Sequence, residues 1–306
     1  MTIMMNSNYI SFWEKYTDLA QGTKYNYKIV YRRFEHFLLQ QSTFDGGLDF
    51  NRLFFVKQSN SFEPIDEEFV LQFLDSLKEN GATRATMRYS ISAMTHLFTF
   101  LKVMKLIDHN PTLNLRNPYS KDVILNRALS EEEVQKVLKA SLRLDPFLRE
   151  YYVMVLLLVT TGLRNQELRM LTWDQVDLER EMIYVVKGQK TNANTVRLTK
   201  RLVNELEAYI NHPYNQNRFN NGNNHLFTRE SGKEMKRKQD LNNCLKKLAL
   251  EAGVKQFTAH CLRHTMAQLL YDKGVELRCI QRQLRHKLIE TTVKYLGTYD
   301  MSLLME

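Results

Sequence analysis

The chain has 306 residues, of which 43% are hydrophobic and 25% charged, which is ordinary for a globular protein and enough for two domains. Only 11 glycines and 5 prolines occur, which argues against long loops and a β-rich architecture, so we expect helices to dominate. The formal net charge of +9 favours a polyanionic partner, although many basic proteins bind no nucleic acid.

The three cysteines form no CxxC pair, which argues against a disulfide framework and against a zinc cluster. The N-terminal segment lacks a signal-peptide pattern, and the longest apolar run, 151–159, is about half the length of a membrane span. We therefore expect a cytoplasmic, nucleoid-associated protein without a membrane partner.

In the first half of the chain, apolar residues recur at helical spacing in four stretches. These stretches are 8–19, 23–39, 66–80 and 83–105. The segment 42–63 is less periodic, and we expect a loop or insertion there. Arg84 and Arg88 lie along the fourth stretch and are candidate DNA contacts, although the sequence does not separate base contacts from phosphate contacts. The pattern predicts a helical domain over 1–115.

A stretch with two prolines and several asparagines, 108–129, separates the two halves of the chain. We place the interdomain linker at 116–127 and the second domain at 128–306. Ser130 and Glu133 have the spacing of a capping box, which predicts the first helix of that domain.

Helical periodicity continues through the second domain. It predicts helices at 130–141, 146–160, 164–171, 199–211, 236–251, 259–273 and 275–284. Between them, Met182–Val186 and Thr195–Leu198 are expected to pair as a hairpin around a turn at 187–194. The asparagine-rich segment 211–222 is expected to be a loop. The predicted fold class is mainly α with a small β-sheet.

Residues suited to phosphoryl transfer are scattered along the second domain. They are Arg164, Glu167, Lys190, His260, Arg263, His286 and Tyr295. The planar fork of arginine fits two phosphate oxygens, tyrosine can act as a nucleophile, and histidine or lysine can move protons. No carboxylate cluster stands nearby in the sequence to hold Mg²⁺, so we expect a reaction without a metal or other cofactor.

Three segments resemble the conserved boxes of the tyrosine recombinase or phage-type integrase family, to which Xer-like resolvases and transposon integrases belong. The segment 160–179 (TTGLRNQELRMLTWDQVDLE) resembles the first box, 260–274 (HCLRHTMAQLLYDKG) the second, and 284–295 (LRHKLIETTVKY) the last. The motifs cover 130–299, whereas 8–110 resembles the family only in architecture. The resemblance implies a helical core-binding domain and an α+β catalytic domain that close on duplex DNA.

The resemblance also implies a reaction. Tyr295 would attack the scissile phosphate and leave a 3′-phosphotyrosyl link with a free 5′-hydroxyl. His260 would act as the base toward this tyrosine, and Lys190 would protonate the leaving 5′-oxygen. Because the protein link retains the phosphodiester energy, neither ATP nor a cofactor would be needed.

Four further matched residues would act around the phosphate. Arg164 and Arg263 would bind its non-bridging oxygens, and His286 would add a hydrogen bond there. Glu167 would be a supporting residue that orients the first box. The family therefore implies a site-specific recombinase that integrates, excises, transposes or resolves DNA.

Some positions depart from the family pattern or leave an alternative. Arg285 replaces the glycine that usually precedes the last histidine, and could strain a turn or add a phosphate contact. Lys187 competes with Lys190 as the hairpin lysine, although counting back from the second strand favours Lys190; Lys187 is also a candidate DNA contact. Tyr299 competes with Tyr295 as the nucleophile, although the spacing favours Tyr295.

Other functions remain as alternatives. A type IB topoisomerase would use the same chemistry on one duplex, a binding-only relative would recognise DNA without cutting it, and a basic helical protein could bind RNA. His260 and His264 are four residues apart and could suggest zinc, but no third ligand is evident in the sequence.

The resemblance further implies an assembly on DNA. We expect a homo-tetramer on two recombination sites, because each of two duplexes needs two strand exchanges. The need for an accessory DNA-bending factor, the target sequence and an exchange of the C-terminal tail between protomers stay open.

Overall fold

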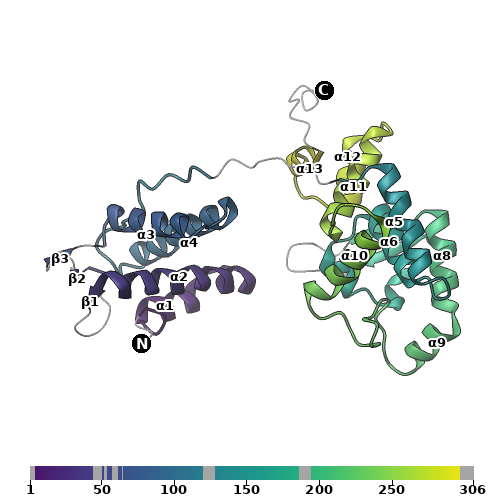
Figure 1. The fold of residues 1–306 in the computed structure, drawn as a ribbon, viewed down its shortest axis with the longest axis horizontal. Helices are drawn as coiled ribbons and strands as arrows, with labels where there is room; N and C mark the ends of the chain where they lie inside the picture. The colour runs from purple at the N-terminus through teal and green to yellow at the C-terminus, as the bar shows by residue number, and fades with distance from the viewer. Residues whose placement is uncertain are drawn as a thin grey trace. The chain divides into compact units, whose positions relative to one another are not determined.

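The computed structural model describes residues 4–43, 50–51, 54–56, 61–63, 65–119, 128–185 and 194–296. The chain divides into two compact units, Met1–Val123 and Ile124–Glu306 (Figure 1). Both units are mostly helical, and each has one three-stranded sheet. The expected fold class is confirmed.

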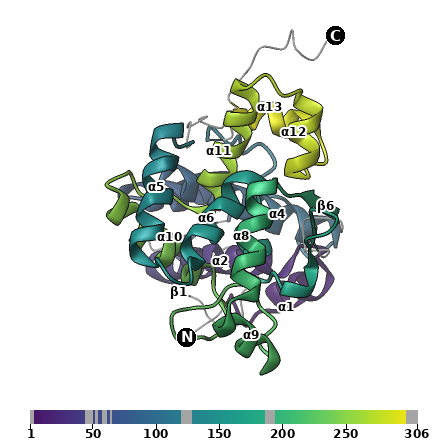
Figure 2. The ribbon, with the colours of Figure 1, turned by 90° about the vertical axis from the view of Figure 1, so that its right-hand side faces the viewer.

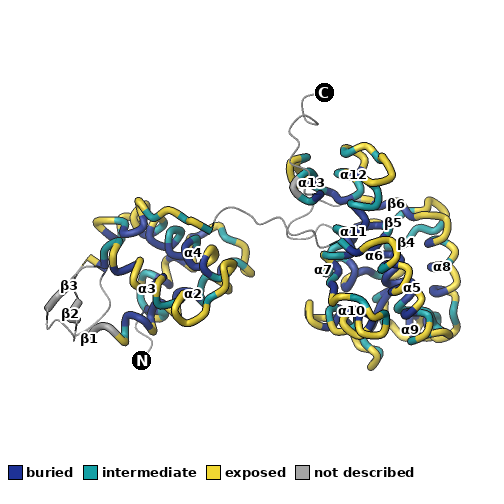
Figure 3. The backbone as a smooth tube through the Cα atoms, turned by 45° about the horizontal axis from the view of Figure 1, so that its top comes forward, coloured by how far each residue is buried: buried dark blue, intermediate teal, exposed yellow. Residues whose placement is uncertain are grey.

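In its described residues, the N-terminal unit contains four helices. They are α1 (Asn8–Tyr16), α2 (Gln21–Gln41), α3 (Glu67–Glu79) and α4 (Arg84–Val103). Asp66 and Thr83 start the last two by accepting hydrogen bonds from backbone N–H groups three residues on. Buried and exposed positions alternate along these helices (Figure 3). The buried faces carry large aromatic side chains, such as Trp13 and Phe34, so edge-to-face ring contacts fill much of this core.

The segment 42–63 was expected to be a loop or insertion, and this prediction was wrong in part. Its described residues form β1 (Ser42–Thr43), β2 (Phe54–Val56) and β3 (Ser61–Glu63), paired antiparallel in this order. Strands of two or three residues are too short to show the alternation that reveals a strand in sequence. Phe50 anchors the segment, since its buried ring lies 5.3 Å from that of Phe98 on α4.

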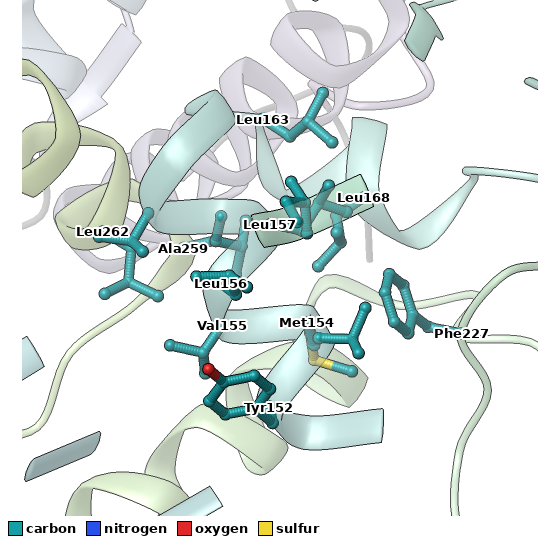
Figure 4. Packing of buried hydrophobic residues seen from close by; sticks show 14 of the residues in the cluster. Tyr152, Met154, Val155, Leu156, Leu157, Leu163, Leu168, Phe227, Ala259 and Leu262 are labelled. Carbon is teal, nitrogen blue, oxygen red and sulfur yellow. The ribbon is translucent and has the colours of Figure 1, made fainter. Parts of the chain in front are cut away.

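The C-terminal unit is organised around α6 (Glu150–Thr161), which is buried on nearly all sides. Its neighbours are α5 (Glu131–Leu144), α8 (Lys200–Asn211) and α11 (Ala259–Asp272) (Figure 2). An apolar run this continuous cannot face water, so helices cover it from several directions (Figure 4). The capping box predicted at Ser130 is present at the start of α5.

The remaining elements complete this unit. They are α7 (Asn165–Arg169), a 3-10 turn (Trp173–Gln175), β4 (Val176–Asp177), β5 (Met182–Val185), β6 (Asn194–Arg197), α9 (Pro213–Asn220), α10 (Lys238–Ala252), α12 (Leu277–Leu284) and α13 (Ile289–Leu296). The sheet order is β4-β5-β6, antiparallel, with buried Ile183 opposite buried Val196. The predicted hairpin strands are therefore present, although most of the turn between them lies outside the described residues.

The asparagine-rich segment 211–222 was expected to be a loop, but it contains helix α9. Asparagine is a poor helix former, so composition pointed the wrong way. Pro213 starts the helix, and the buried Asn215 amide donates to the Tyr209 carbonyl oxygen at 2.7 Å. The Phe219 ring also stacks on that of Trp173, so contacts outside the helix offset the low helix propensity of its asparagines.

Candidate active site

The turn after α6 brings the first candidate arginine to the site. Gly162 ends the helix with φ +62°, and α7 begins at Asn165, directly after Arg164. A Cβ atom on Gly162 would lie 2.4 Å from Met266 Cε on α11 and 3.6 Å from Arg263 Cγ. Glycine therefore satisfies both the left-handed backbone and the close approach of α11.

Glu167 holds Arg164 in place. The Arg164 guanidinium donates to Glu167 Oε1 at 2.9 Å, and the Arg164 backbone N–H donates to Oε2 at 2.7 Å. Burial alone would raise the pKa of the Glu167 carboxyl, but the positive charges of Arg285 and Arg164 outweigh it and lower the pKa. Glu167 is therefore an ionised carboxylate that orients the arginine beside it.

Arg263 is the most deeply buried cation of the group, at 2% exposure. It donates to the carbonyl oxygens of Gly162 and Leu284, which joins the turn after α6 to the end of α12. Burial, followed by repulsion from Arg164 and Arg285, lowers its pKa to about 9, so it remains charged at neutral pH. Two backbone carbonyls thus fix this guanidinium before any substrate binds.

Tyr295, on α13, is surrounded by three histidine rings. Its hydroxyl lies 3.0 Å from His260 Nδ1, and the His264 ring stacks on the tyrosine ring at 3.4 Å between centroids. The His286 ring centroid is 5.3 Å from that of Tyr295. Burial raises the pKa of Tyr295 to about 12 although Arg263 and Arg164 act against it. The phenol is therefore protonated at neutral pH and needs a base to become a nucleophile.

His286 is held by the same helix that carries the tyrosine. Its Nδ1 lies 3.0 Å from the hydroxyl oxygen of Thr292, which is fully buried on α13. Burial, with added repulsion from Arg263, lowers the pKa of His286 to about 3. Its neutral imidazole can donate one hydrogen bond and accept another at this site without adding a positive charge.

Arg285 stands in the position where a glycine was expected, and it adopts the left-handed conformation at φ 57°. Its side chain is 2% exposed and donates to Glu167 Oε2 at 2.6 Å. Of the two outcomes expected from sequence, the strained turn is present, whereas the guanidinium is directed at Glu167 and not at solvent where a phosphate would approach.

Six of the candidate residues are brought together in this unit from three separate stretches of chain. They are Arg164, Glu167, His260, Arg263, His286 and Tyr295. Lys187, Lys190 and Tyr299 lie outside the described residues. Two contributions were missed in the sequence: the pairing of Arg285 with Glu167 and the stacking of His264 on Tyr295. The LRH and HxxRH motifs contain Arg285 and His264 but do not predict their contacts.

The remaining candidates belong to the N-terminal unit or concern metals and membranes. Arg84 and Arg88 are exposed on α4. Among the described residues, no group of three His, Cys, Asp or Glu side chains is placed to hold a metal ion, so a zinc pair at His260 and His264 finds no third ligand there. Within the same residues, every helix is too short or too polar to cross a membrane.

Comparisons with known proteins agree on one family. The profile described as "Phage integrase family" matches residues 127–301. Tyrosine recombinase XerC of Roseiflexus castenholzii is 31% identical over 77% of this chain and 75% of its own length. Tyrosine recombinase XerD of Halalkalibacterium halodurans is 29% identical over 76% of this chain and 77% of its own.

Solved structures show the same fold. XerH site-specific recombinase bound to palindromic difH substrate, in a post-cleavage complex, matches with a TM-score of 0.70 at 21% identity, over 92% of this chain and 77% of that one. A lambda integrase dimer bound to a core site matches with a TM-score of 0.69 at 16% identity, over 94% of each chain.

Proposed function

Because the chain belongs to the phage integrase family, the tyrosine recombinases, we propose that it cuts and rejoins DNA at specific sites through a 3′-phosphotyrosyl link to Tyr295. One observation carries the assignment of the nucleophile. The Tyr295 hydroxyl lies 3.0 Å from His260 Nδ1, beside two arginines whose guanidinium groups are already held in place. This combines a nucleophile, a base and a site for a phosphate.

In the proposed reaction the Tyr295 oxygen attacks the scissile phosphorus, and His260 accepts the phenolic proton. A phenol with a pKa of about 12 needs such a base at neutral pH. The bond from phosphorus to the 5′-oxygen then breaks, and Lys190 protonates this oxygen as it leaves. In the second half of the exchange, a 5′-hydroxyl attacks the phosphotyrosine and releases Tyr295, so the phosphoester energy is conserved without ATP.

The arginines stabilise the pentavalent phosphorane. Arg164 and Arg263 bind its non-bridging oxygens, and His286 adds a hydrogen bond to the same group. Glu167 holds Arg164 in the required orientation. Donors that are fixed before the reaction need no reorganisation when negative charge develops, which is why the buried hydrogen bonds of Arg263 favour this role.

The second strand of the lysine hairpin contacts the last box. Gln283, two residues before Arg285, has its amide Nε2 3.4 Å from the Arg197 carbonyl oxygen at the end of β6. The strand that follows the lysine turn is thereby linked to the last box, which supports a role for a lysine of this turn. We assign the proton donor to Lys190, which precedes β6 by fewer residues than Lys187 does, and a DNA contact to Lys187.

The proposed partner is duplex DNA carrying recombination sites, and solved neighbours such as XerH are bound to such DNA. Arg84 and Arg88, exposed on α4, contact the DNA. The protein acts in the cytoplasm as a homo-tetramer that pairs two sites, and an accessory DNA-bending factor assists where the sites require bending. Transposition and chromosome dimer resolution are both compatible with this chemistry.

Covalent capture tests the proposal. The protein is mixed with nicked duplex fragments of its source genome and denatured, and the DNA that remains attached is recovered and sequenced. Tyr295→Phe removes the nucleophile, and Tyr299→Phe is its matched control four residues on. We expect attachment by the wild type and the control but none by Tyr295→Phe. Attachment that depends on Tyr299, or DNA binding by the wild type with no attachment, would overturn the assignment.

A further inference from the structure

We propose that Arg285 is a positioning residue of the recombination site. It shares the Glu167 carboxylate with Arg164, so that Arg164 can also bind the phosphate, and it adds a buried positive charge beside Arg164. This role rests on the proposed function, because it concerns the same reaction. Arg285 occupies the position where the family resemblance led us to expect glycine, so the inference concerns a property of this chain.

The first argument is the sharing of one carboxylate between two arginines. Glu167 Oε1 accepts from Arg164 at 2.9 Å, and Oε2 accepts from Arg285 at 2.6 Å. The Arg164 side chain keeps 33% exposure, whereas that of Arg285 keeps 2%. Arg285 thus pairs with the carboxylate from the buried side, and the Arg164 guanidinium keeps an exposed side that a phosphate can reach.

The second argument is the charge that remains. Three guanidinium groups, those of Arg164, Arg263 and Arg285, surround the single carboxylate of Glu167 in the described residues. Three positive charges and one negative charge give this cluster a net charge of +2. A glycine at position 285 would lower the net charge to +1, and Glu167 would then pair with Arg164 alone. The phosphorane gains negative charge in the transition state, so this difference acts mainly on the chemical step.

The third argument is that the contact between Arg285 and Glu167 forms in spite of an unfavourable backbone conformation and an unpaired buried nitrogen. Arg285 holds φ at 57°, a region that glycine occupies more easily, and its buried Nε has no hydrogen-bond partner among the described residues. Its other nitrogens donate to Glu167 and to the carbonyl oxygens of Gly162 and Gln283. The contact joins the last box to the first across 118 residues of sequence.

The test begins with four single variants on a nicked duplex carrying the captured site. Arg285→Gln removes the charge, and Arg282→Gln makes the same change on an exposed side chain of the same helix end. Arg285→Gly guards against misfolding, because glycine accepts the left-handed turn. Arg285→Lys keeps the charge but loses the planar fork. Single-turnover covalent attachment and DNA affinity are measured for each variant, with affinity measured in a Tyr295→Phe background.

We expect Arg285→Gln and Arg285→Gly to slow attachment at saturating DNA by about tenfold to a hundredfold, as other losses of a fixed positive group near a reacting centre do. Affinity should change less than about threefold, because a buried guanidinium releases no counterion from the DNA. Arg285→Lys should recover part of the rate, and Arg282→Gln should match the wild type. Combining Arg285→Gln with Glu167→Gln should cost less than the product of the two single losses, because the part of the Arg285 effect that acts through the Glu167 carboxylate is already lost in Glu167→Gln.

Three outcomes would overturn this role. Attachment at the wild-type rate by folded Arg285→Gln and Arg285→Gly would reduce Arg285 to a structural residue. Weaker affinity with a salt dependence lowered by about one would make it a direct phosphate contact. Additive losses in the double variant would remove Glu167 as the intermediary. A wild type that forms no covalent link is the separate failure, since it overturns the proposed function and this role together.

Discussion

Two pairs of arginines, one in each unit of the molecule, differ in burial. Arg84 and Arg88 lie exposed on α4, over a core of apolar and aromatic side chains. In the C-terminal unit, Arg263 and Arg285 are buried and held by backbone carbonyls and by Glu167. Exposed cations can approach DNA from solvent and release its counterions, which suits contact with a continuous phosphate backbone. Buried cations lose hydration but gain a fixed geometry, which suits one phosphate in a reaction.

The largest effect is expected from Arg263→Gln. Two carbonyl oxygens lose their donor, which should lower the free energy of unfolding by about 2–4 kcal/mol. The phosphorane also loses a fixed donor, which should slow single-turnover attachment by roughly a thousandfold. Chemical denaturation and attachment at saturating DNA measure the two effects.

Arg169→Gln is the matched control for Arg263. Arg169 is also buried and donates to two backbone carbonyls, those of Met235 and Lys236, away from the tyrosine. The Arg169→Gln variant should lose about as much stability as Arg263→Gln, but its folded fraction should attach DNA at the wild-type rate. Equal rate losses in both variants would mean that burial of arginine contributes rigidity alone and would remove the contrast between the two units.

Gly162→Ala should produce the next effect, mainly on stability. The added methyl group meets Met266 Cε at 2.4 Å and strains a backbone at φ +62°. We expect a loss of about 2–4 kcal/mol, combining left-handed strain with overpacking. Gly253→Ala isolates the strain, because its φ of +64° is similar but nothing lies within 4 Å of the new methyl group. If Gly162→Ala lowers the free energy of unfolding no more than Gly253→Ala does, then α11 can move away from the new methyl group and does not fix Arg263.

The pH dependence of stability should carry a smaller signal from His286. The unfolded chain binds a proton at this residue near its ordinary pKa of 6.5, whereas burial and Arg263 lower the folded pKa to about 3. The unfolded state therefore binds more protons between these values, so this contribution to stability falls as the pH falls from about 6.5 towards 3.

Comparing the wild type with His286→Gln isolates that contribution from the carboxyl groups. Because the imidazole is only partly buried, we expect the wild type to lose about 1 kcal/mol more than the variant between pH 7 and pH 4. Urea denaturation at each pH measures the difference. Parallel curves for the two proteins would show that His286 titrates normally and that the arginines do not act on it.

The sequence predicted most helices and the composition of the site, because long periodic segments and ordered motifs are local signals. It failed where the decisive contacts are distant. Helix α9 is supported by the stacking of Phe219 on Trp173, and the short strands near Phe50 depend on packing against the aromatic core. The direction of the Arg285 side chain could not be inferred either, since it depends on the position of Glu167 on another helix. Motif spacing identifies which residues meet, whereas their hydrogen bonds require the fold.

The smallest effect is expected in the N-terminal unit, from the double variant Arg84→Gln with Arg88→Gln. Removing two exposed cations should weaken DNA affinity about fivefold and reduce the slope of log affinity against log salt by about one for each phosphate that the variant no longer binds. Lys78→Gln, an exposed change on α3, is the control for loss of charge in the same unit. Attachment at saturating DNA should remain within about twofold of the wild type, because these side chains set how much DNA is bound and not how the phosphate is held. A slow reaction at saturation would show instead that α4 positions the scissile phosphate, and the division between binding by exposed arginines and chemistry by buried ones would fail.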